Sequence, residues 1–404
     1  MKKYDSSNLE EFKDEKFLIN ICDQEPIHIP GSIQSFGYSV VLGEDANIKF
    51  CSENIKELTG VTLDELIGTD ISSVIADSDV LNTILNDSRK VEIFYNREVI
   101  GTNNRYDIAV LPSTGKGYRT IEFQLSIVNS SLLESLDTTI DDLYDAKSIQ
   151  ELYDKTVHWV KRVIGFDRVK LYIFDEHWNG NVVAEAKEDF MPSYLGMRFP
   201  ASDIPSQARA LYVRNRTRVI ADVGSDVVPL LPKVKLTEAV DLSDSLIRSV
   251  SPIHIEYLGN MGIGASFSVS LIVEGKLIGL LACHHNSPKN IGLAQRKKSE
   301  IIGRIFSLEL TRLGLERSKI IKKNFQEGLG KKILTIGQNE NFELGIERVF
   351  PDLMEFLNLD GIGFRDEKGY NGFGIILDSD EISQIEEKWL SKHDLKIHSV
   401  NNIG

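Results

Sequence analysis

The chain has 404 residues, of which 42% are hydrophobic and 26% are charged, and its formal net charge is −14. This length predicts two or three domains, and the composition is typical of a folded globular protein. The negative charge argues against general nucleic-acid or membrane-surface binding, because both need clustered positive charge. No apolar run spans a bilayer, no signal peptide is evident, and three unpaired cysteines (Cys22, Cys51 and Cys283) indicate a reduced, cytoplasmic protein.

Residues 1–16 are polar and charged, which favours a flexible N-terminal arm. Residues 17–128 combine strand-like alternation, as in "RKVEIFYNREVI" and "RTIEFQLSIV", with a capped helical stretch, "NIKELTGVTLDELIG". A second domain is expected over residues 129–318, beginning with helical spacing and a strand, "DRVKLYIF". Residues 319–404 predict the start of a third domain. The fold class is therefore α+β.

The second domain ends in a predicted long helix over residues 294–329. Apolar residues Ile301, Ile305, Leu308 and Leu315 follow one stripe along it. Such a stripe is most often buried against a second chain or domain. We therefore expect a homodimer that forms through this helix.

The stretch "FPASDIPSQARALYVRNRTRVIADV" combines an aspartate, a proline and several arginines. Pro205 suits the first turn of a helix and forces Ile204 into extended backbone. Asp203 then either caps this helix or leaves its backbone carbonyl to a ligand. Arg218 follows on a strand, where its guanidinium suits a carboxylate or phosphate, although a solvated arginine face fits the sequence as well.

Residues 265–285 predict a β-hairpin with its turn at Glu274–Gly275. Strict alternation puts Ser266, Ser268 and Ser270 on one face of the first strand. The predicted register brings Ser266 close to His284. Hydroxyls and a histidine on one buried face favour the wall of a polar-lined ligand pocket. A structural serine face that binds water is the alternative.

Several other kinds of site are not supported. The glycine-rich stretch "GNMGIGAS" precedes a strand instead of a helix, so it is no dinucleotide fingerprint. "CHH" contains metal-ligand residue types, but no second cluster has matching spacing, so no metal site is predicted. No hydrolase, metalloprotease, P-loop or histidine-kinase motif is present. The sequence therefore predicts a binding protein without catalytic residues.

Four motifs in order resemble those of the bacteriophytochromes, which are red/far-red photoreceptors with a PAS–GAF–PHY sensory module and a linear tetrapyrrole. They are "CDQEPIHIPGSIQSFG", "PASDIPSQARALY", "SPIHIEYLGNMGIGASFSVSL" and "ACHH". The resemblance runs from about residue 15 to the end of the chain. It implies a PAS domain at 17–128, a GAF domain at 129–318 and a partial PHY domain at 319–404.

The resemblance also implies a role for each pocket residue. Asp203 would offer its backbone carbonyl to the pyrrole N–H groups, and His254 would lie beside the pyrroles. Arg218 and Arg248, with Tyr212 and Ser251, would bind one propionate, and Ser266, Ser268 and His254 the other. His284 would donate to the carbonyl of ring D. The remaining expected contacts are apolar or aromatic: Tyr172, Phe199, Ile204, Ile253 and Tyr257.

The expected chromophore is biliverdin, held by a thioether to Cys22. Relatives in plants and many cyanobacteria attach the bilin just before the histidine of the "SPIHIEYL" region, where this chain has Ile253. Bacterial relatives use an N-terminal cysteine instead, which matches Cys22. Asp23 and Glu25 raise the expected thiol pKa, so attachment would depend on holding the thiol against ring A.

Two further expectations come from the resemblance alone. The segment around Ile33 would pass through a GAF lasso near "DVGSDVVPLLP", which forms a figure-of-eight knot. The "PRxSF"-like motif of the PHY tongue is not found, so we expect the far-red-absorbing state to be reached or held poorly. The alternatives are a PAS–GAF sensor of another small ligand, such as a nucleotide or haem, and the sensory part of a histidine kinase.

Overall fold

The computed structural model describes residues 25–86, 89–114, 117–127, 136–232, 239–325, 327, 330, 348–357, 359–366, 369–378 and 380–383. Cys22, the predicted attachment residue, lies outside them. The chain divides into two compact units, with the boundary between Leu313 and Gly314. The predicted PAS region lies in the first unit, and so does the predicted GAF region except for residues 314–318.

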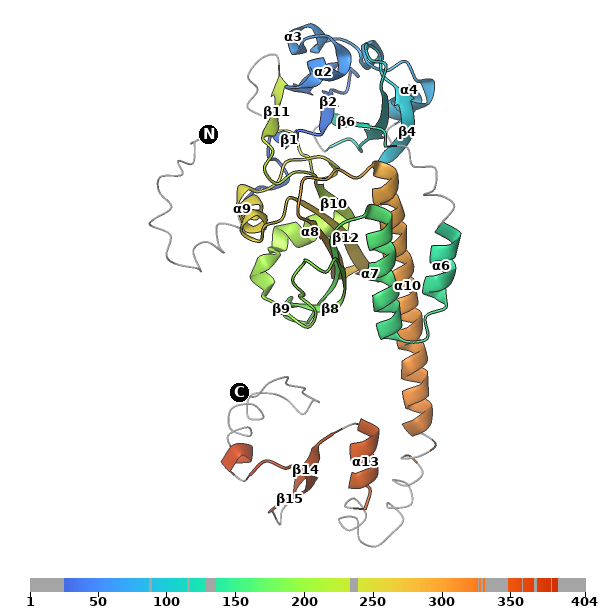
Figure 1. The fold of residues 1–404 in the computed structure, drawn as a ribbon, viewed down its shortest axis with the longest axis vertical. Coiled ribbons are helices and arrows are strands. Elements are labelled where there is room, and N and C mark those ends of the chain that lie inside the picture. The colour runs from blue at the N-terminus through green and yellow to red at the C-terminus, as the bar shows by residue number, and fades with distance from the viewer. Residues whose placement is uncertain are drawn as a thin grey trace, which may run out of the picture. The chain divides into compact units, whose positions relative to one another are not determined.

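The PAS region is built on one antiparallel sheet, with strands in the order β1-β11-β3-β2-β6-β5-β4 (Figure 1). The predicted strands around residues 89–100 and 119–128 are β4 and β6, so both predictions are confirmed. Short helices cover the sheet, and α4 begins where the Asp77 carboxylate accepts from two backbone N–H groups. The elements are β1 (Ser32–Gln34), β2 (Gly37–Leu42), β3 (Ile48–Ser52), α2 (Ile55–Thr59), α3 (Leu63–Leu66), η2 (Ile71–Ser73), α4 (Ser78–Leu85), β4 (Glu92–Glu98), β5 (Arg105–Val110) and β6 (Arg119–Leu125).

Strand β11 (Val227–Pro232) joins this sheet although it comes from the GAF part of the chain. It pairs with β3 on one side and with β1 on the other. Ile33 in β1 is fully buried, opposite Val228 on one side and bridged to Arg248 on the other. The N-terminal segment is thus enclosed by GAF residues. The expected knot closes through residues 233–238, which lie outside the described residues, so it stays a prediction.

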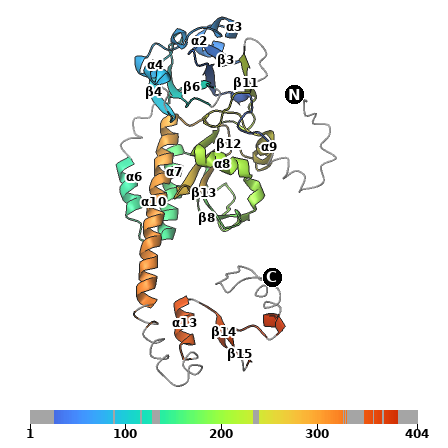
Figure 2. The same ribbon diagram turned by 180° about the vertical axis from the view of Figure 1, so that it is seen from behind.

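The GAF region has a second antiparallel sheet, in the order β10-β12-β13-β7-β8-β9. Helices α7 and α10 run along one side of it (Figures 1 and 2), and their apolar residues share one core with Phe267 and Val269. Helix α8 packs on the same sheet through β12 and β13. The elements are α6 (Leu136–Tyr144), α7 (Ile149–Ile164), β7 (Arg168–Phe174), β8 (Gly180–Lys187), β9 (Arg198–Phe199), η3 (Ala201–Asp203), α8 (Ser206–Arg214), β10 (Thr217–Ile220), α9 (Pro252–Asn260), β12 (Ala265–Val273), β13 (Lys276–His285) and α10 (Leu293–Asn324).

The predicted hairpin is confirmed as β12 and β13. Its turn residues Glu274 and Gly275 have φ angles of 49° and 78°, the left-handed backbone of a tight hairpin turn. Ser266 pairs with His284, as the turn position predicts. The alternation also holds, because Phe267 is fully buried in the core while Ser266 and Ser268 line a cavity on the other face.

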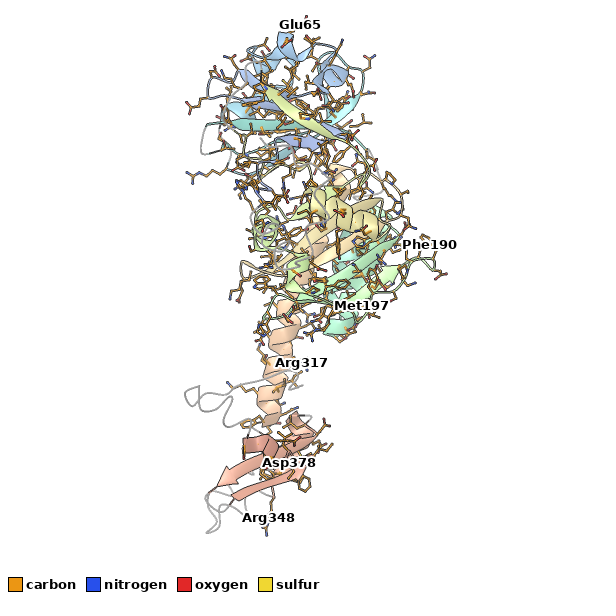
Figure 3. All side chains as sticks on the ribbon, turned by 90° about the vertical axis from the view of Figure 1, so that its left-hand side faces the viewer. Glu65, Phe190, Met197, Arg317, Arg348 and Asp378 are labelled. Atoms are coloured by element: carbon orange, nitrogen blue, oxygen red, sulfur yellow. The ribbon has the colours of Figure 1, made fainter. Side chains whose placement is uncertain are left out.

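Helix α10 packs on the GAF sheet with a different stripe from the predicted one. Ile302, Phe306 and Leu313 are buried. Leu308 and Leu315 of the predicted stripe are 70% and 59% exposed. Side-chain spacing alone does not tell which of two neighbouring apolar stripes meets the sheet. Figure 3 labels Arg317 on the same helix, and Phe190 and Met197, which are exposed between β8 and β9.

After the end of α10, the second unit contains the described elements α13 (Phe350–Leu357), β14 (Gly361–Asp366) and β15 (Gly369–Gly374). The two strands pair antiparallel. These elements agree with an α+β class but do not test the predicted PHY domain. Within the described ranges, no helix is both long and apolar enough to cross a membrane.

Candidate chromophore pocket

A cavity of about 320 Å³ lies between the GAF sheet and the segments that carry α8 and α9. This volume is within the range of small-molecule sites. All predicted pocket residues that the structure describes line it. They are Tyr172, Phe199, Asp203, Ile204, Tyr212, Arg218, Arg248, Ser251, Ile253, His254, Tyr257, Ser266, Ser268 and His284.

Two arginines, the buried Arg248 and the half-buried Arg218, lie in the cavity wall. Arg218 on β10 donates through Nη2 to the carbonyls of Arg248 and Ser249, at 2.7 and 2.9 Å. The Nη1 atoms of Arg218 and Arg248 are both buried without a hydrogen-bond partner. Burial lowers both guanidinium pKa values, and for Arg218 the Arg248 charge lowers it further. A ligand carboxylate is the group that would satisfy both donors.

Glu25 lines the cavity close to this pair, and sequence reasoning did not assign it there. Its Oε2 accepts from the Ser251 hydroxyl at 2.6 Å. Ile27 also contributes to the wall. Two residues of the described segment that starts at Glu25 therefore contribute to the cavity wall.

His254, Tyr257 and Asp203 form a second polar group. The His254 and Tyr257 rings are stacked, with centroids 6.0 Å apart. Burial and the Arg218 charge lower the His254 pKa to about 4, so this imidazole is neutral at pH 7. The Tyr257 hydroxyl donates to Asp203 Oδ2 at 3.4 Å, and burial raises the Asp203 pKa.

Asp203 does not cap helix α8, so the capping alternative is wrong. The N-cap residue is Pro205, which makes no side-chain cap. The sequence predicted Pro205 within the first helical turn. In the structure Pro205 comes one residue before the helix, which starts at Ser206. Ile204 lies outside the helical region, as expected before a proline, but its angles of φ −130° and ψ 88° are not those of regular extended backbone.

His284 is held in one tautomer by Arg168, a residue that sequence reasoning missed. Arg168 Nη2 lies 3.0 Å from His284 Nδ1. Because a guanidinium only donates, Nδ1 must accept, which leaves the proton on Nε2. Burial, Lys170 and Arg168 keep the His284 pKa well below its usual value. The neutral ring is thus a hydrogen-bond donor through Nε2.

Lys170 is a second residue that sequence reasoning missed. It lines the cavity, is 5% exposed, and its ammonium lies 4.7 Å from the Tyr194 ring centre and 5.4 Å from that of Phe199. Period-two alternation is the signal that would have found it. Tyr172 was expected in the pocket, and Lys170 and Arg168 precede it by two and four residues on β7.

Two of the three alternating serines on β12 line the cavity. Ser266 and Ser268 line it, whereas the Ser270 hydroxyl donates to the carbonyl of Tyr212 at 2.7 Å. Cys283 and Cys51 are buried thiols, as expected of small apolar residues, and burial raises both pKa values. The site therefore combines cationic, neutral polar and aromatic groups around one space.

Comparisons with known proteins agree with this architecture. Residues 148–301 match the GAF domain family and residues 22–109 match the PAS fold family. The "Bacteriophytochrome" of Xanthomonas campestris pv. campestris is 31% identical over 93% of this chain and 60% of its own length. "Cyanobacterial phytochrome B" of Nostoc sp. is 37% identical over 72% of this chain and 40% of its own. The chain thus spans about half the length of these two relatives.

Among solved structures, the Stigmatella aurantiaca phytochrome photosensory core module aligns with a TM-score of 0.79. The two sequences are 30% identical, and the alignment covers 91% of this chain and 75% of that one. Both domain matches, the order of the motifs and this likeness lead to one conclusion. The chain belongs to the phytochrome family and contains a bacteriophytochrome-like PAS–GAF module.

Proposed function

We propose that this chain is the light-sensing part of a red/far-red photoreceptor and that its GAF cavity binds biliverdin. The observation that carries the proposal is the pair of buried arginine Nη1 atoms without partners, on Arg218 and Arg248. A buried guanidinium N–H group without an acceptor costs free energy that a bound carboxylate offsets. A bilin offers two propionates, ring N–H groups and a large apolar surface.

The polar residues divide naturally between the two propionates. Arg218 and Arg248, with Tyr212 and Ser251, suit one carboxylate. Ser266 and Ser268 point from β12 into the same cavity, and with neutral His254 they suit the other. Glu25 already accepts from Ser251, so a carboxylate ligand must displace it or share that hydroxyl.

His284, which pairs with Ser266 across the hairpin, offers Nε2 as a donor suited to the ring D carbonyl. Tyr172, Phe199 and Tyr257 supply aromatic walls for ring D. Ile204 and Ile253 add apolar surface, and the Asp203 carbonyl is proposed to accept from the pyrrole N–H groups. A bound bilin supplies light absorption and isomerisation next to ring D. The pocket contacts determine the relative stability of the two isomers.

Covalent attachment through Cys22 is consistent with the short connection between Cys22 and the cavity wall. Glu25 lies in the cavity wall three residues after Cys22. Three extended residues span at most about 11 Å. The Cys22 thiol can therefore reach the same cavity and form a thioether with ring A. The two described thiols are buried and free, which fits the reducing cytoplasm that we propose as the location.

The proposal is tested by adding biliverdin to the purified chain and recording spectra in the dark and after red light. We expect a red absorption band that changes under red light and returns in the dark or under far-red light. Arg218→Met and Arg248→Met should each weaken biliverdin binding about tenfold or more, because a buried charge-assisted bond is lost. Arg214→Met is the matched control, since that guanidinium pairs with Asp244 outside the cavity. Equal binding by all three variants, or no red band, would contradict the proposal.

A further inference from the structure

Glu122 is a fully buried carboxyl group in the middle of the PAS sheet. It lies on β6, opposite Ser39 of β2 and Ala109 of β5, and its exposed fraction is 0%. Burial raises its pKa to about 7, against hydrogen bonds and arginine charges that lower it. A carboxyl group in this position exchanges its proton near neutral pH. None of the proposed chromophore contacts uses it.

The Glu122 carboxyl binds the GAF segment that forms the arginine end of the cavity. Its Oε1 accepts from the Ser245 hydroxyl, and its Oε2 accepts from the Leu246 N–H at 2.9 Å. The Ser245 hydroxyl oxygen in turn accepts from the Ile247 N–H at 3.2 Å. The next residue is Arg248. Glu122 thus fixes the backbone immediately before this arginine.

The same segment also holds the second arginine. The carbonyls of Arg248 and Ser249 accept from Arg218 Nη2. Both guanidinium groups are therefore positioned by one segment, and Glu122 attaches that segment to the PAS sheet. A displacement of this carboxyl would move both arginines together.

Charges on several surrounding elements act on Glu122. Arg296 of α10 and Arg218 of β10 favour its ionised form. Arg248 is stabilised as a cation by Glu122, and also by Asp241 and Asp244. Arg296 is likewise buried, with Glu122 and Asp107 of β5 opposing the fall of its pKa to about 9. The Glu122 carboxylate therefore interacts electrostatically with three arginines, two in the cavity and one on the long helix.

We propose that Glu122 is a positioning residue of the pocket that takes up a proton from water when a ligand carboxylate binds Arg218 and Arg248. The inference rests on the proposed function, because it needs a carboxylate-bearing ligand. A ligand carboxylate adds negative charge near Glu122 and shares the arginines that stabilise its ionised form. The neutral form is then favoured, and the Ser245 and Leu246 contacts to its oxygens are still available.

The consequence for binding has a definite sign. Glu122 is partly ionised at pH 7 in the free protein, and ligand binding raises its pKa further. Affinity for a carboxylate ligand must then fall as pH rises through about 7, by at most about tenfold per pH unit for one proton. The two cavity histidines do not contribute, because burial keeps the pKa values of His254 and His284 below this range. Lys170 of the same cavity has a pKa of about 8 and also titrates here, but it is present in every variant, so the contribution of Glu122 is the difference between the parent and Glu122→Gln.

The experiment uses the Cys22→Ser chain, in which binding is reversible and thiol ionisation plays no part. The dissociation constants of biliverdin and of its dimethyl ester are measured from about pH 6 to 8.5, on either side of the Glu122 pKa. For biliverdin we expect the constant to rise severalfold per pH unit above that pKa. The ester, which lacks the carboxylates, should show a much smaller change.

Glu122→Gln on the same background removes the titrating group and keeps an acceptor for Leu246. The pH dependence of biliverdin binding should then fall to that of the ester. Glu65→Gln, at an exposed carboxyl of the same domain, is the matched control and should leave the pH dependence unchanged. If the Glu122→Gln chain does not fold, calorimetry of the parent in buffers of different ionisation enthalpy still counts the protons taken up with each ligand.

The outcomes separate the two proposals. Equal pH dependence in the parent and in Glu122→Gln, or no extra proton uptake with biliverdin over its ester, overturns the role of Glu122 while biliverdin binding stands. If neither pigment binds at any pH, the proposed function fails, and this inference fails with it. If the pH dependence of biliverdin binding is lost in Glu122→Gln but kept in Glu65→Gln, the result supports both the proposed function and the role of Glu122.

Discussion

Lys170 is a buried ammonium in a part of the pocket wall that is otherwise aromatic. Burial and the Arg168 charge lower its pKa to about 8, although Glu185, Cys283 and Asp203 act in the opposite direction. The folded protein therefore holds this cation at a cost in free energy. The lysine is still mostly charged at pH 7, next to the neutral ring of His284.

Replacing Lys170 by methionine should stabilise the protein without pigment. The native pKa of about 8 lies below the ordinary lysine pKa of 10.5, so the unfolded state binds more protons than the native state between these values. The native lysine protein must then gain stability as pH rises through this window. We expect the advantage of Lys170→Met to shrink by about 2 kcal/mol between pH 7 and 9.5.

Urea unfolding of both proteins at the two pH values measures this difference. Methionine suits the position because it is unbranched, apolar and adaptable. A stability difference that stays constant with pH would mean that Lys170 keeps an ordinary pKa in the folded state.

The pocket residues illustrate what the sequence makes visible. Ser266 and His284 were found from local rules, because a tight turn fixes the register of its own hairpin. Arg168 and Lys170 were missed because alternation tells which residues share a face, but not which face meets the cavity. Only the family resemblance, through Tyr172, indicates that face.

At the scale of elements, the pairing of β7 with β8 leaves space for Tyr172. A Cβ added at Gly180 would lie 1.6 Å from Tyr172 Cζ, although the backbone there has no left-handed φ. Glycine is therefore required for space and not for conformation. The aromatic wall of the pocket depends on this small residue in the neighbouring strand.

Gly180→Ala should destabilise the protein by about 1–3 kcal/mol and displace Tyr172 from the cavity wall. Gly259→Ala in α9 is the control, since a Cβ there meets nothing within 4 Å. The control should be neutral or slightly stabilising. Urea unfolding and pigment spectra of the two variants check both points, and equal behaviour would refute the steric argument.

The PAS sheet shows why part of the fold was not predictable. The strands β4 and β6 follow from alternation within the sequence itself. Strand β11, which lies about 175 residues after β3, joins the same sheet because its partners are provided by a distant segment. Composition and periodicity describe a strand but carry no information on a partner so far along the chain.

At the scale of the whole molecule, the stripe on α10, which is partly exposed, predicts association between two copies. Leu308 is 70% exposed, and Ile301 and Ile305 precede it at coiled-coil spacing. Leu308→Glu would introduce two facing charges in a symmetric helix pair. We expect light scattering to show a dimer for the parent and a monomer for this variant. A change to Lys49→Glu, at a partly exposed and ion-paired residue of β3, should leave the dimer intact.

The central claim is that the GAF cavity holds a bilin attached to Cys22. Biliverdin is added to the purified parent and to Cys22→Ser, and both proteins are then denatured in acid. We predict that pigment stays with the parent chain and leaves the variant, while both bind pigment before denaturation. Pigment retained by both chains would exclude Cys22 as the anchor, and no uptake by either would contradict the photoreceptor account.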